Sequence, residues 1–307
     1  MSCAFVAVDW GTTSLRAYAV AADGRVLART ASAHGIQSRQ GDFEATLAQA
    51  LEALPGSGTA PVLMAGMIGS QQGWVEAPYV ETPCSADVLA RRLTDVPTVS
   101  LARPVKIVPG VAHLARGVPD VMRGEETQLL GLIQLDGLQA GSHVVCMPGT
   151  HCKWVRLHDG VIVEFSTYMT GELFKLLSEQ SILGRLMVRN GDADVDDWAG
   201  FDAGIDRVQR ESGHLMHQLF AVRTEGLFKR RPATALKSYL SGLLIGHELQ
   251  AALQDVPASA PVVLVGDDRL TARYQRGLER RGVAVRHAPQ DIVVAGLASI
   301  ARAAGWC

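Results

Sequence analysis

Two hydrophobic patterns alternate along the chain, one typical of strands and one typical of helices. Short apolar runs, of the length of buried strands, occur at residues 4–8, 15–20, 26–31, 62–65, 143–147, 154–157, 161–165, 262–265 and 284–286. Longer segments with apolar residues at helical spacing occur at 43–54, 171–186, 212–227, 232–253, 270–281 and 291–304. Because hairpins and strand–helix–strand units alternate, we expect an α/β protein with mixed sheets flanked by helices.

The same strand plan occurs twice, once near the start of each half. In the first half, a turn at residues 9–13 joins two strands, and Asp23-Gly24 predicts a hairpin turn to the third. In the second half, a turn at 148–151 and the pair Asp159-Gly160 take the same places. The repeat predicts that each half has a loop rich in glycine and threonine after its first strand.

Length and composition indicate a two-lobed globular protein. At 307 residues the chain is about twice the usual domain size, which favours two lobes. Hydrophobic residues make up 48% of the chain and charged residues 20%, a composition typical of globular proteins. The formal net charge of -2 provides no basic footprint for nucleic acid or for an anionic membrane, so we expect neither as a partner.

The cysteines and the first residues predict a cytoplasmic protein. The five cysteines are few, odd in number and scattered, which argues against a disulfide framework. No basic region precedes the first apolar run, which ends at Asp9, so we expect no signal peptide. No apolar run reaches the length of about 18 residues that a membrane span needs.

The two glycine- and threonine-rich loops have the chemistry of a polyphosphate site. Backbone N–H groups in such turns converge on anions, and glycine permits close approach. Threonine hydroxyls add hydrogen bonds, and an aspartate at a strand end, such as Asp9, can hold Mg²⁺ through water. One such loop alone is more simply interpreted as an ordinary hairpin turn, but its duplication favours phosphate binding.

Three segments resemble the nucleotide motifs of the actin/hexokinase/acetate-kinase ATPase superfamily. Residues 9–14 (DWGTTS) resemble its first phosphate motif, and residues 148–154 (PGTHCKW) resemble its second. Residues 262–267 (VVLVGD) stand where its adenosine motif is expected, with Asp267 in place of the second glycine.

The resemblance implies two ribonuclease-H-like lobes with an ATP cleft between them. The N-terminal lobe is expected to comprise residues 1–125 and the C-terminal helix 291–307, with the first phosphate loop and the sugar-acid site. Residues 126–290 would form the other lobe, with the second phosphate loop and the adenosine site. The small residues Ala295 and Gly296 would permit a close helix crossing at the hinge.

Three segments together narrow the resemblance to the 2-dehydro-3-deoxygalactonokinase family of galactonate catabolism. They are the long loop 65–74, the run 122–128 (MRGEETQ) and Pro-Gly-Thr-His at 148–151, and the resemblance covers essentially the whole chain. Cys152 stands where the family has serine, a near-isosteric exchange. The resemblance implies ATP-dependent phosphorylation of 2-dehydro-3-deoxy-D-galactonate at its 6-hydroxyl, which yields 2-dehydro-3-deoxy-6-phospho-D-galactonate.

The resemblance also implies which residues bind ATP and Mg²⁺. Asp9 would organise Mg²⁺ through water, and an aspartate that caps a turn is the alternative. The phosphate and adenosine contacts are expected from Gly11, Thr12, Thr13, Gly149, Thr150, Lys153, Gly266 and Asp267. Two of these residues have a structural alternative: Lys153 as an exposed strand lysine, and Asp267 as the cap of the next helix.

The substrate is an anionic 2-keto acid with several hydroxyls, so its site needs a cation and hydrogen-bonding groups. Arg16 and Arg123 are the candidates for its carboxylate. The other substrate candidates are Gln71, Gln72, Trp74 and His151. A surface or packing role is equally compatible with each of these residues.

A general base must take the proton of the attacking hydroxyl. In sugar kinases of this superfamily an acidic residue at the start of the first connecting helix does so. Glu126 aligns with that acidic residue and is the first candidate for the general base. Glu125 is the second candidate, and Asp9 is the third. The alternative is that both glutamates only stabilise a helix N-terminus.

Two other functions are compatible with the same motifs. One is a kinase of another sugar or sugar acid on the same fold, and the other is a non-catalytic nucleotide or sugar sensor. Such a sensor would usually carry a DNA-binding helix-turn-helix, which we do not expect here. For assembly, a homodimer is one expectation.

Overall fold

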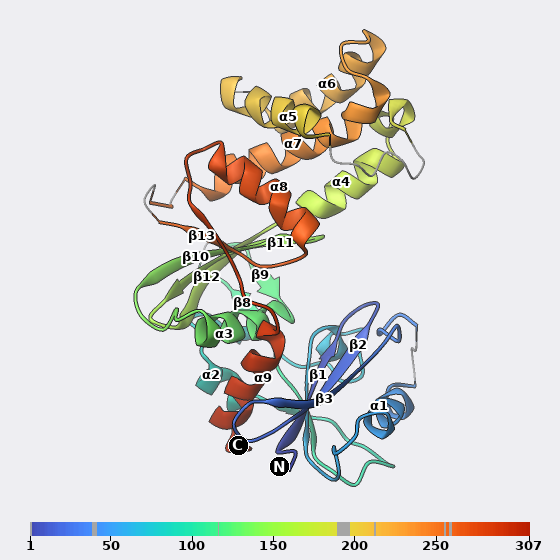
Figure 1. Ribbon diagram of the computed structural model, residues 1–307, viewed down its shortest axis with the longest axis vertical. Coiled ribbons are helices and arrows are strands. Elements are labelled where there is room, and N and C mark those ends of the chain that lie inside the picture. Colours follow the sequence, from blue (N-terminus) through green and yellow to red (C-terminus); the bar gives the residue numbers. More distant parts are fainter. Residues whose placement is uncertain are drawn as a thin grey trace. The chain divides into compact units, whose positions relative to one another are not determined.

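The computed structural model describes residues 2–38, 42–115, 117–188, 197–211, 213–254, 256–257 and 260–307 (Figure 1). The elements of the first half are β1 (Phe5–Trp10), β2 (Leu15–Val20), β3 (Val26–Ser32), α1 (Phe43–Glu52), β4 (Val62–Ala65), the 3-10 helix η1 (Met67–Gly69), β5 (Val80–Glu81), α2 (Ala86–Ala90), β6 (Thr94–Asp95), β7 (Val105–Ile107), β8 (Val111–His113), β9 (Asp120–Met122) and α3 (Glu125–Leu135).

The second half continues this alternation. Its elements are β10 (Ser142–Met147), β11 (Cys152–His158), β12 (Val161–Tyr168), α4 (Thr170–Glu179), the 3-10 helix η2 (Leu183–Leu186), α5 (Trp198–Arg210), α6 (Leu215–Leu227), α7 (Ala233–Ala252), β13 (Val262–Leu264), α8 (Asp268–Glu279), β14 (Val285–His287) and α9 (Ile292–Ala303).

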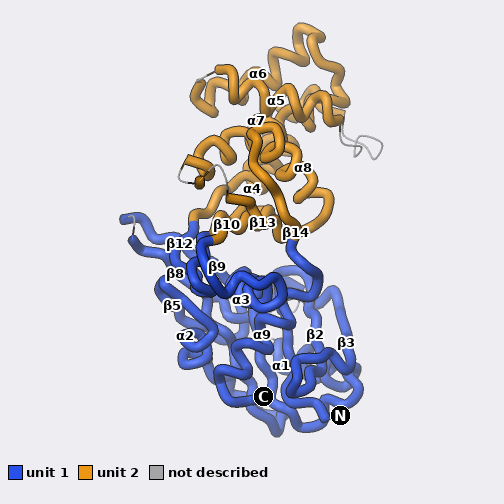
Figure 2. The backbone as a smooth tube through the Cα atoms, turned by 60° about the vertical axis from the view of Figure 1, so that its left-hand side comes forward, with its two compact units in different colours: residues 1–142, 156–165, 288–307 blue, residues 143–155, 166–287 orange. Residues whose placement is uncertain are grey.

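The chain forms two compact units. Unit 1 comprises residues 1–142, 156–165 and 288–307, and unit 2 comprises residues 143–155 and 166–287 (Figure 2). Each unit therefore contains segments that are far apart in the sequence.

Unit 1 is built on a six-stranded sheet of order β3-β2-β1-β4-β7-β6. Strands β1, β2 and β3 form the predicted antiparallel meander, and β4 pairs in parallel with β1 and with β7. The first four residues of β1, Phe5 to Val8, are fully buried, as the continuous apolar run of a central strand predicts. The end of β1 therefore lies at the middle of this sheet.

A second, three-stranded sheet of unit 1, of order β5-β8-β9, was not predicted from the sequence. Its strands are only two or three residues long. Such short strands carry too few positions for an alternating pattern to be visible.

Helices α3 and α9 cross in direct backbone contact within unit 1, where they lie alongside each other (Figure 1). A Cβ on Gly131 would lie 1.7 Å from Ile292 O, and a Cβ on Gly296 would lie 1.8 Å from Thr127 O. The close crossing at Gly296 is therefore confirmed. Residues 126–142, which we expected in the C-terminal lobe, group with unit 1 because α3 packs on α9.

The sheet of the second half has the order β12-β11-β10-β13-β14. Strand β13 pairs in parallel with β10 and with β14. Both sheets thus place their first four strands in the order third, second, first and fourth, which confirms the repeat that the sequence predicted. Beyond the fourth strand they differ, because the sheet of unit 1 continues with β7 and then β6.

Helix α5 of unit 2 was also missed, although Phe201, Ile205 and Val208 recur at helical spacing on its buried face. Glycines bring it close to α7. A Cβ on Gly204 would lie 2.5 Å from Tyr239 O, and a Cβ on Gly242 would lie 2.1 Å from Phe201 O. These glycines let the backbones of α5 and α7 touch.

Two helix boundaries differ from the predictions. The helix expected over 171–186 ends at Glu179, because the Ser181 hydroxyl donates to Leu177 O and accepts from Leu183 N–H, which closes the helix end. The helix expected over 212–227 begins at Leu215, and residue 212 lies outside the described residues. Among the described residues, no helix is both long and apolar enough to cross a membrane.

Candidate functional site

The loop after β1 is held by the segment that follows β3. The amides of Ile36 and Gln37 donate to Gly11 O (3.1 Å) and to Thr12 O (3.3 Å). Gly35 approaches so closely that a Cβ there would lie 2.2 Å from Thr12 O. The carbonyls of this loop are thus engaged by the protein, an arrangement compatible with amides that face an anion.

Asp9 and Arg16 lie opposite each other on β1 and β2. Arg16 Nη1 is 3.6 Å from Asp9 Oδ2, and 24% of the Asp9 side chain remains exposed. Burial raises the pKa of Asp9, and the charge of Arg16 opposes that rise. The structure thus places Arg16, a candidate for the substrate carboxylate, beside the candidate metal-binding aspartate.

Two glycines bring the end of β1 close to the start of α3. A Cβ on Gly66, directly after β4, would lie 3.6 Å from Asp9 Oδ1, and a Cβ on Gly124 would lie 3.4 Å from Gly66 Cα. Both glycines have a positive φ, +94° and +103°, which other residues rarely adopt. The candidate metal ligand and the candidate bases of α3 therefore belong to one site in unit 1.

Glu126 is fully buried at the first turn of α3. Its Oε2 accepts a hydrogen bond from Gly124 N–H (2.6 Å), whereas its Oε1 has no hydrogen-bond partner among the described residues. Burial, with a contribution from the charge of Glu125, raises the pKa of Glu126 to about 8. This carboxyl group can therefore change its protonation state near neutral pH.

Arg123 and Glu125 flank this carboxyl group. Glu125 Oε2 accepts from the backbone N–H of Arg123 (3.0 Å), and Arg123 Nη2 donates to Ala77 O (2.7 Å). The Arg123 guanidinium lies 4.5 Å from the centre of the Tyr79 ring, a cation–π contact. Its Nε and Nη1 atoms are buried and have no hydrogen-bond partner among the described residues, so they remain available to an anion.

The long loop after β4 folds back on itself. Trp74 N–H donates to Ile68 O (2.9 Å), and the Trp74 ring stacks on Phe43 with 6.5 Å between the ring centres. Trp74 thus packs on the core of unit 1. Gln71 and Gln72, the other two candidates of this loop, are exposed.

In unit 2, the N-terminus of α4 holds the loop after β10. A Cβ on Gly171 would lie 2.3 Å from Gly149 O, and Glu172 N–H donates to Thr150 O (2.9 Å). The Glu172 carboxylate lies 2.5 Å from His151 Nε2. Gly149, Thr150 and His151 are therefore fixed from one side, and the Thr150 side chain is exposed on the other.

Lys153 is buried, with 5% of its surface exposed, and its ammonium donates to Thr167 Oγ1 (2.7 Å). The alternative of an exposed strand lysine is therefore wrong. The side chain is directed into the protein between β11 and β12.

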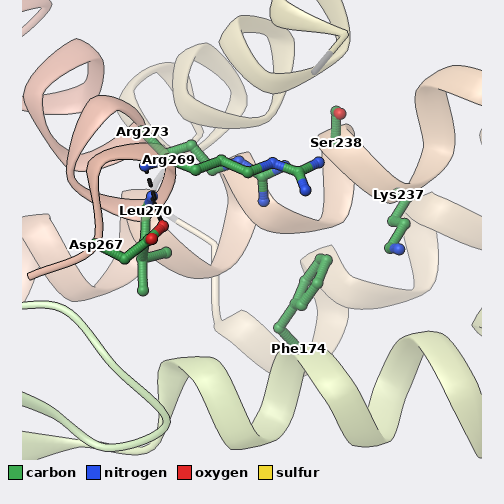
Figure 3. A pocket seen from close by; sticks show the side chains of 7 residues that line it. All are labelled: Phe174, Lys237, Ser238, Asp267, Arg269, Leu270 and Arg273. Atoms are coloured by element: carbon green, nitrogen blue, oxygen red, sulfur yellow. Dashed lines mark hydrogen bonds between the residues drawn. The ribbon is translucent and has the colours of Figure 1, made fainter. Parts of the chain in front are cut away.

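A hollow of about 200 Å³ lies between α4, α7 and α8 of unit 2 (Figure 3). It is lined by Phe174, Lys237, Ser238, Asp267, Arg269, Leu270 and Arg273. A smaller hollow shares Phe174, Leu270 and Arg273 and extends to Gly149 of the loop after β10. We call the larger hollow the recess; its lining is both apolar and cationic. The smaller hollow connects the recess with the predicted second phosphate loop.

The predicted adenosine motif forms one wall of this recess. Asp267 Oδ1 accepts from the amides of Arg269 (3.0 Å) and Leu270 (3.4 Å) at the start of α8 (Figure 3). The helix-capping interpretation of Asp267 is thus confirmed, although the residue also lines the pocket. Gly266 has a φ of +150°, and a Cβ there would lie 3.3 Å from Pro148 O.

The family model for 2-keto-3-deoxy-galactonokinase matches residues 9–300 of the chain. The chain belongs to this family. It is 42% identical over 301 residues to a protein of Rhizobium meliloti (strain 1021) named as a probable 2-dehydro-3-deoxygalactonokinase, and the match covers 97% of both chains. It is 35% identical over 305 residues to the 2-dehydro-3-deoxygalactonokinase of Escherichia coli (strain K12), with 99% of both covered.

Solved structures agree with this family membership. A Sinorhizobium meliloti crystal structure described under the same enzyme name has a TM-score of 0.87 and 41% identity, and covers 97% of this chain and 98% of that one. Component A of the Acidaminococcus fermentans (R)-2-hydroxyglutaryl-CoA dehydratase has a TM-score of 0.51 at 10% identity, with 98% of both chains covered, and is similar in fold alone. With the repeated strand order, these similarities confirm the predicted fold class.

The family motifs identified only part of the pocket in unit 2. Gly149 and Asp267 were predicted, but the lining residues of α4, α7 and α8 were not. Arg269 and Arg273 could have been found from the sequence, because they follow the adenosine motif directly. They are four residues apart, which places both on one face of α8. Phe174 is one apolar residue among many and carried no such signal.

Proposed function

We propose that this protein is an ATP-dependent kinase that transfers a phosphoryl group to the 6-hydroxyl of 2-dehydro-3-deoxy-D-galactonate. The observation that carries the proposal is the family match over residues 9–300, together with relatives of that enzyme name at 42% and 35% identity. Phosphoryl transfer requires the protein mainly to position the reactants and to stabilise charge. The polar groups described above are suited to those two tasks.

Glu126 is the proposed general base. Its Oε1 would accept the proton of the 6-hydroxyl as that oxygen attacks the γ-phosphorus, while Oε2 stays bound to Gly124 N–H. A pKa of about 8 is close to the working pH, which is favourable for proton transfer in both directions. Glu125, whose carboxylate is bound to the backbone of Arg123, is the less suitable candidate.

Asp9 fits a Mg²⁺ site. Its carboxylate is partly exposed at the end of a central strand, and carboxylate oxygens are ligands that Mg²⁺ prefers, directly or through water. When bound, Mg²⁺ would neutralise the phosphate charge. Arg16 then has a second proposed role beside its carboxylate-binding one, because its charge opposes the rise in the pKa of Asp9 that burial causes.

The hollows of unit 2 are the proposed nucleotide site. Phe174 offers an aromatic face for a base, and Lys237, Arg269 and Arg273 bring positive charge to the recess. Gly149 and Thr150 are proposed to contact the β- and γ-phosphates. For Gly11, Thr12 and Thr13 of unit 1 phosphate binding is likewise proposed.

Arg123 is the stronger of the two candidates for the substrate carboxylate. Its buried Nε and Nη1 have no partner among the described residues, whereas Arg16 lies beside Asp9. A planar guanidinium binds a carboxylate with two parallel hydrogen bonds. Gln71, Gln72 and His151 are proposed to bind substrate hydroxyls, and Trp74 is proposed to act through packing.

The test is a coupled ADP-release assay with 2-dehydro-3-deoxy-D-galactonate, its C4 epimer, glucose and N-acetylmannosamine as acceptors. We expect release with the first acceptor, well above the rate without sugar, and a 6-phosphorylated product by ³¹P NMR. Equal rates with and without acceptor would contradict kinase activity. A preference for glucose or for the amino sugar would replace the proposed substrate with another one.

A further inference from the structure

Among the described residues of unit 2, one carboxylate is buried in the core, between α7, α8 and β11. Glu248 on α7 is 3% exposed, in a stretch of the helix that is otherwise almost entirely apolar. Its Oε1 accepts from the indole N–H of Trp154 (2.7 Å), and its Oε2 accepts from the hydroxyls of Tyr274 (2.7 Å) and Thr170. A buried carboxylate is costly unless its oxygens accept hydrogen bonds, and here three donors converge on them.

The direction of these hydrogen bonds shows how the site uses the Glu248 side chain. An indole N–H can only donate, and both hydroxyls also donate here, so Glu248 acts as an acceptor at both oxygens. Cys146 and Cys152 lie near the same carboxylate and complete a potential three-ligand metal group. Because both carboxylate oxygens already accept hydrogen bonds, the arrangement is better suited to fixing its donors than to binding an ion.

Two of these donors, Thr170 and Trp154, lie next to the second phosphate loop. Thr170 is the first residue of α4, and the next two residues hold the loop: Gly171 packs on Gly149 O, and Glu172 N–H donates to Thr150 O. Trp154 belongs to β11, the strand that leaves the same loop. Glu248 therefore holds both the outgoing strand and the helix end that fix residues 149–151.

The third donor, Tyr274, lies at the recess of unit 2. Tyr274 lies on α8, one position after Arg273 and one turn after Leu270, and it lines the smaller hollow together with Gly149. Helix α7, which carries Glu248, contributes Lys237 to the larger hollow. One carboxylate thus connects the walls of the recess with the phosphate loop.

We infer that Glu248 is a positioning residue that sets the second phosphate loop against the nucleotide recess through Thr170, Trp154 and Tyr274. The inference rests on the proposed use of ATP. It predicts that loss of this carboxylate displaces the loop and leaves the recess formed. Contacts to the β-phosphate should then weaken, while contacts to the nucleoside and α-phosphate persist.

The experiment compares the affinities for Mg·ADP and AMP by isothermal titration calorimetry. For Thr170→Val, which removes the hydrogen bond between α4 and Glu248, we expect ADP affinity to fall about tenfold while AMP affinity changes by less than about twofold. Thr170 also lines the smaller hollow, so Glu248→Gln, whose side chain lines neither hollow, serves as the independent variant. Glu248→Gln keeps an acceptor for Trp154 and presents its amide to the two hydroxyls, so its ADP loss should be smaller than that of Glu248→Ala. Thr46→Val is the matched control, since its hydroxyl donates to Asp42 O in the first turn of α1 in unit 1.

The outcomes separate the positioning role from the proposed function. Equal losses of affinity for ADP and for AMP in the Glu248 variants would assign this residue a general structural role. An unchanged ratio of ADP affinity to AMP affinity in Thr170→Val would overturn the positioning role and leave the proposed function intact. If the unaltered protein binds neither nucleotide, the proposed ATP use fails and the inference falls with it. Should Glu248→Ala fail to fold, Thr170→Val and Glu248→Gln still decide the question.

Discussion

The two glycine- and threonine-rich loops show how one topology can hold two different kinds of chemistry. Each loop follows the first strand of a sheet, and the first four strands of the two sheets have the same order. Each is braced by a glycine that comes after the third strand, Gly35 in unit 1 and Gly171 in unit 2, and that packs on the loop's own backbone. The bracing is thus common to both loops, and it depends on backbone geometry rather than on side chains.

The surroundings of the two loops differ in charge. Near the loop of unit 1 the structure gathers acidic groups, Asp9 and Glu126, whose pKa values burial raises. Near the loop of unit 2 it gathers the cations of the recess, among them Arg269 and Arg273. If the proposed assignments hold, unit 1 provides the groups for metal binding and proton transfer, and unit 2 provides the recess for the nucleotide.

The strongest test of this division is Glu126→Gln. Turnover should fall by about 10²–10⁴-fold, because the amide cannot take the proton of the attacking hydroxyl. Nucleotide affinity should stay nearly unchanged by calorimetry, since the recess belongs to unit 2. Glu125→Gln is the matched control. If turnover is lost in Glu125→Gln and kept in Glu126→Gln, Glu125 is the general base. If turnover is kept in both variants, Asp9 becomes the candidate.

The shared bracing can be tested with Gly35→Ala and Gly171→Ala. Each added methyl would lie within 2.3 Å of a loop carbonyl oxygen, so the loop backbone must move. We expect turnover to fall by about a hundredfold through misplacement and the free energy of unfolding in urea to fall by about 1–3 kcal/mol. Full activity in either variant would show that the corresponding loop tolerates displacement and that the two braces are not equivalent.

The hydroxyls at the loop tips can be compared through Thr12→Val and Thr150→Val. If both loops contact phosphate, each substitution should cost about 1–3 kcal/mol in kcat/KM for ATP, the range for a hydrogen bond to a charged group. The circular dichroism spectrum should be unchanged. Unaltered kinetics in both variants would contradict phosphate binding by these loops.

The smallest expected effect concerns the stability of unit 1 as a function of pH. Because the pKa of Glu126 is higher in the folded protein, at about 8, than the ordinary 4.5, the folded state binds more protons between these values. The free energy of unfolding should therefore decrease as the pH rises from about 5 to about 8, by at least about 1 kcal/mol. In urea unfolding of Glu126→Gln, this decrease of the free energy of unfolding with pH should be absent. Parallel pH profiles of the two proteins would contradict the raised pKa.

Much of the fold could be predicted because both sheets are built from strands with clear apolar runs. The meander of β1, β2 and β3 and the hairpins of the second half follow directly from such runs and from the Asp-Gly turns. The strands that were missed, β5 to β9, are only two or three residues long and too short to show a pattern. The five-residue helix α2 was missed as well, and so was α5, although α5 has apolar residues at helical spacing.

The candidate site could be predicted only where a motif lies in one continuous segment. Asp9, the loop residues and the glutamates of α3 stand in such segments, and their roles stay predictions. Glu248, Phe174 and Arg273 lie in helices and come together only through tertiary packing. Their place cannot be inferred from spacing, because the pairing of α4, α7 and α8 is a property of the folded core.

The contact between α3 and α9 also has a consequence for biosynthesis. Helix α9 follows all of unit 2 in the chain, although it packs on α3 of unit 1 through Gly131 and Gly296. A ribosome therefore completes unit 2 before the last helix of unit 1 is available, and domains generally fold as they emerge. Until then the helix that carries Glu126 lacks its neighbour, so the nascent chain acquires its proposed proton acceptor only with its final fold.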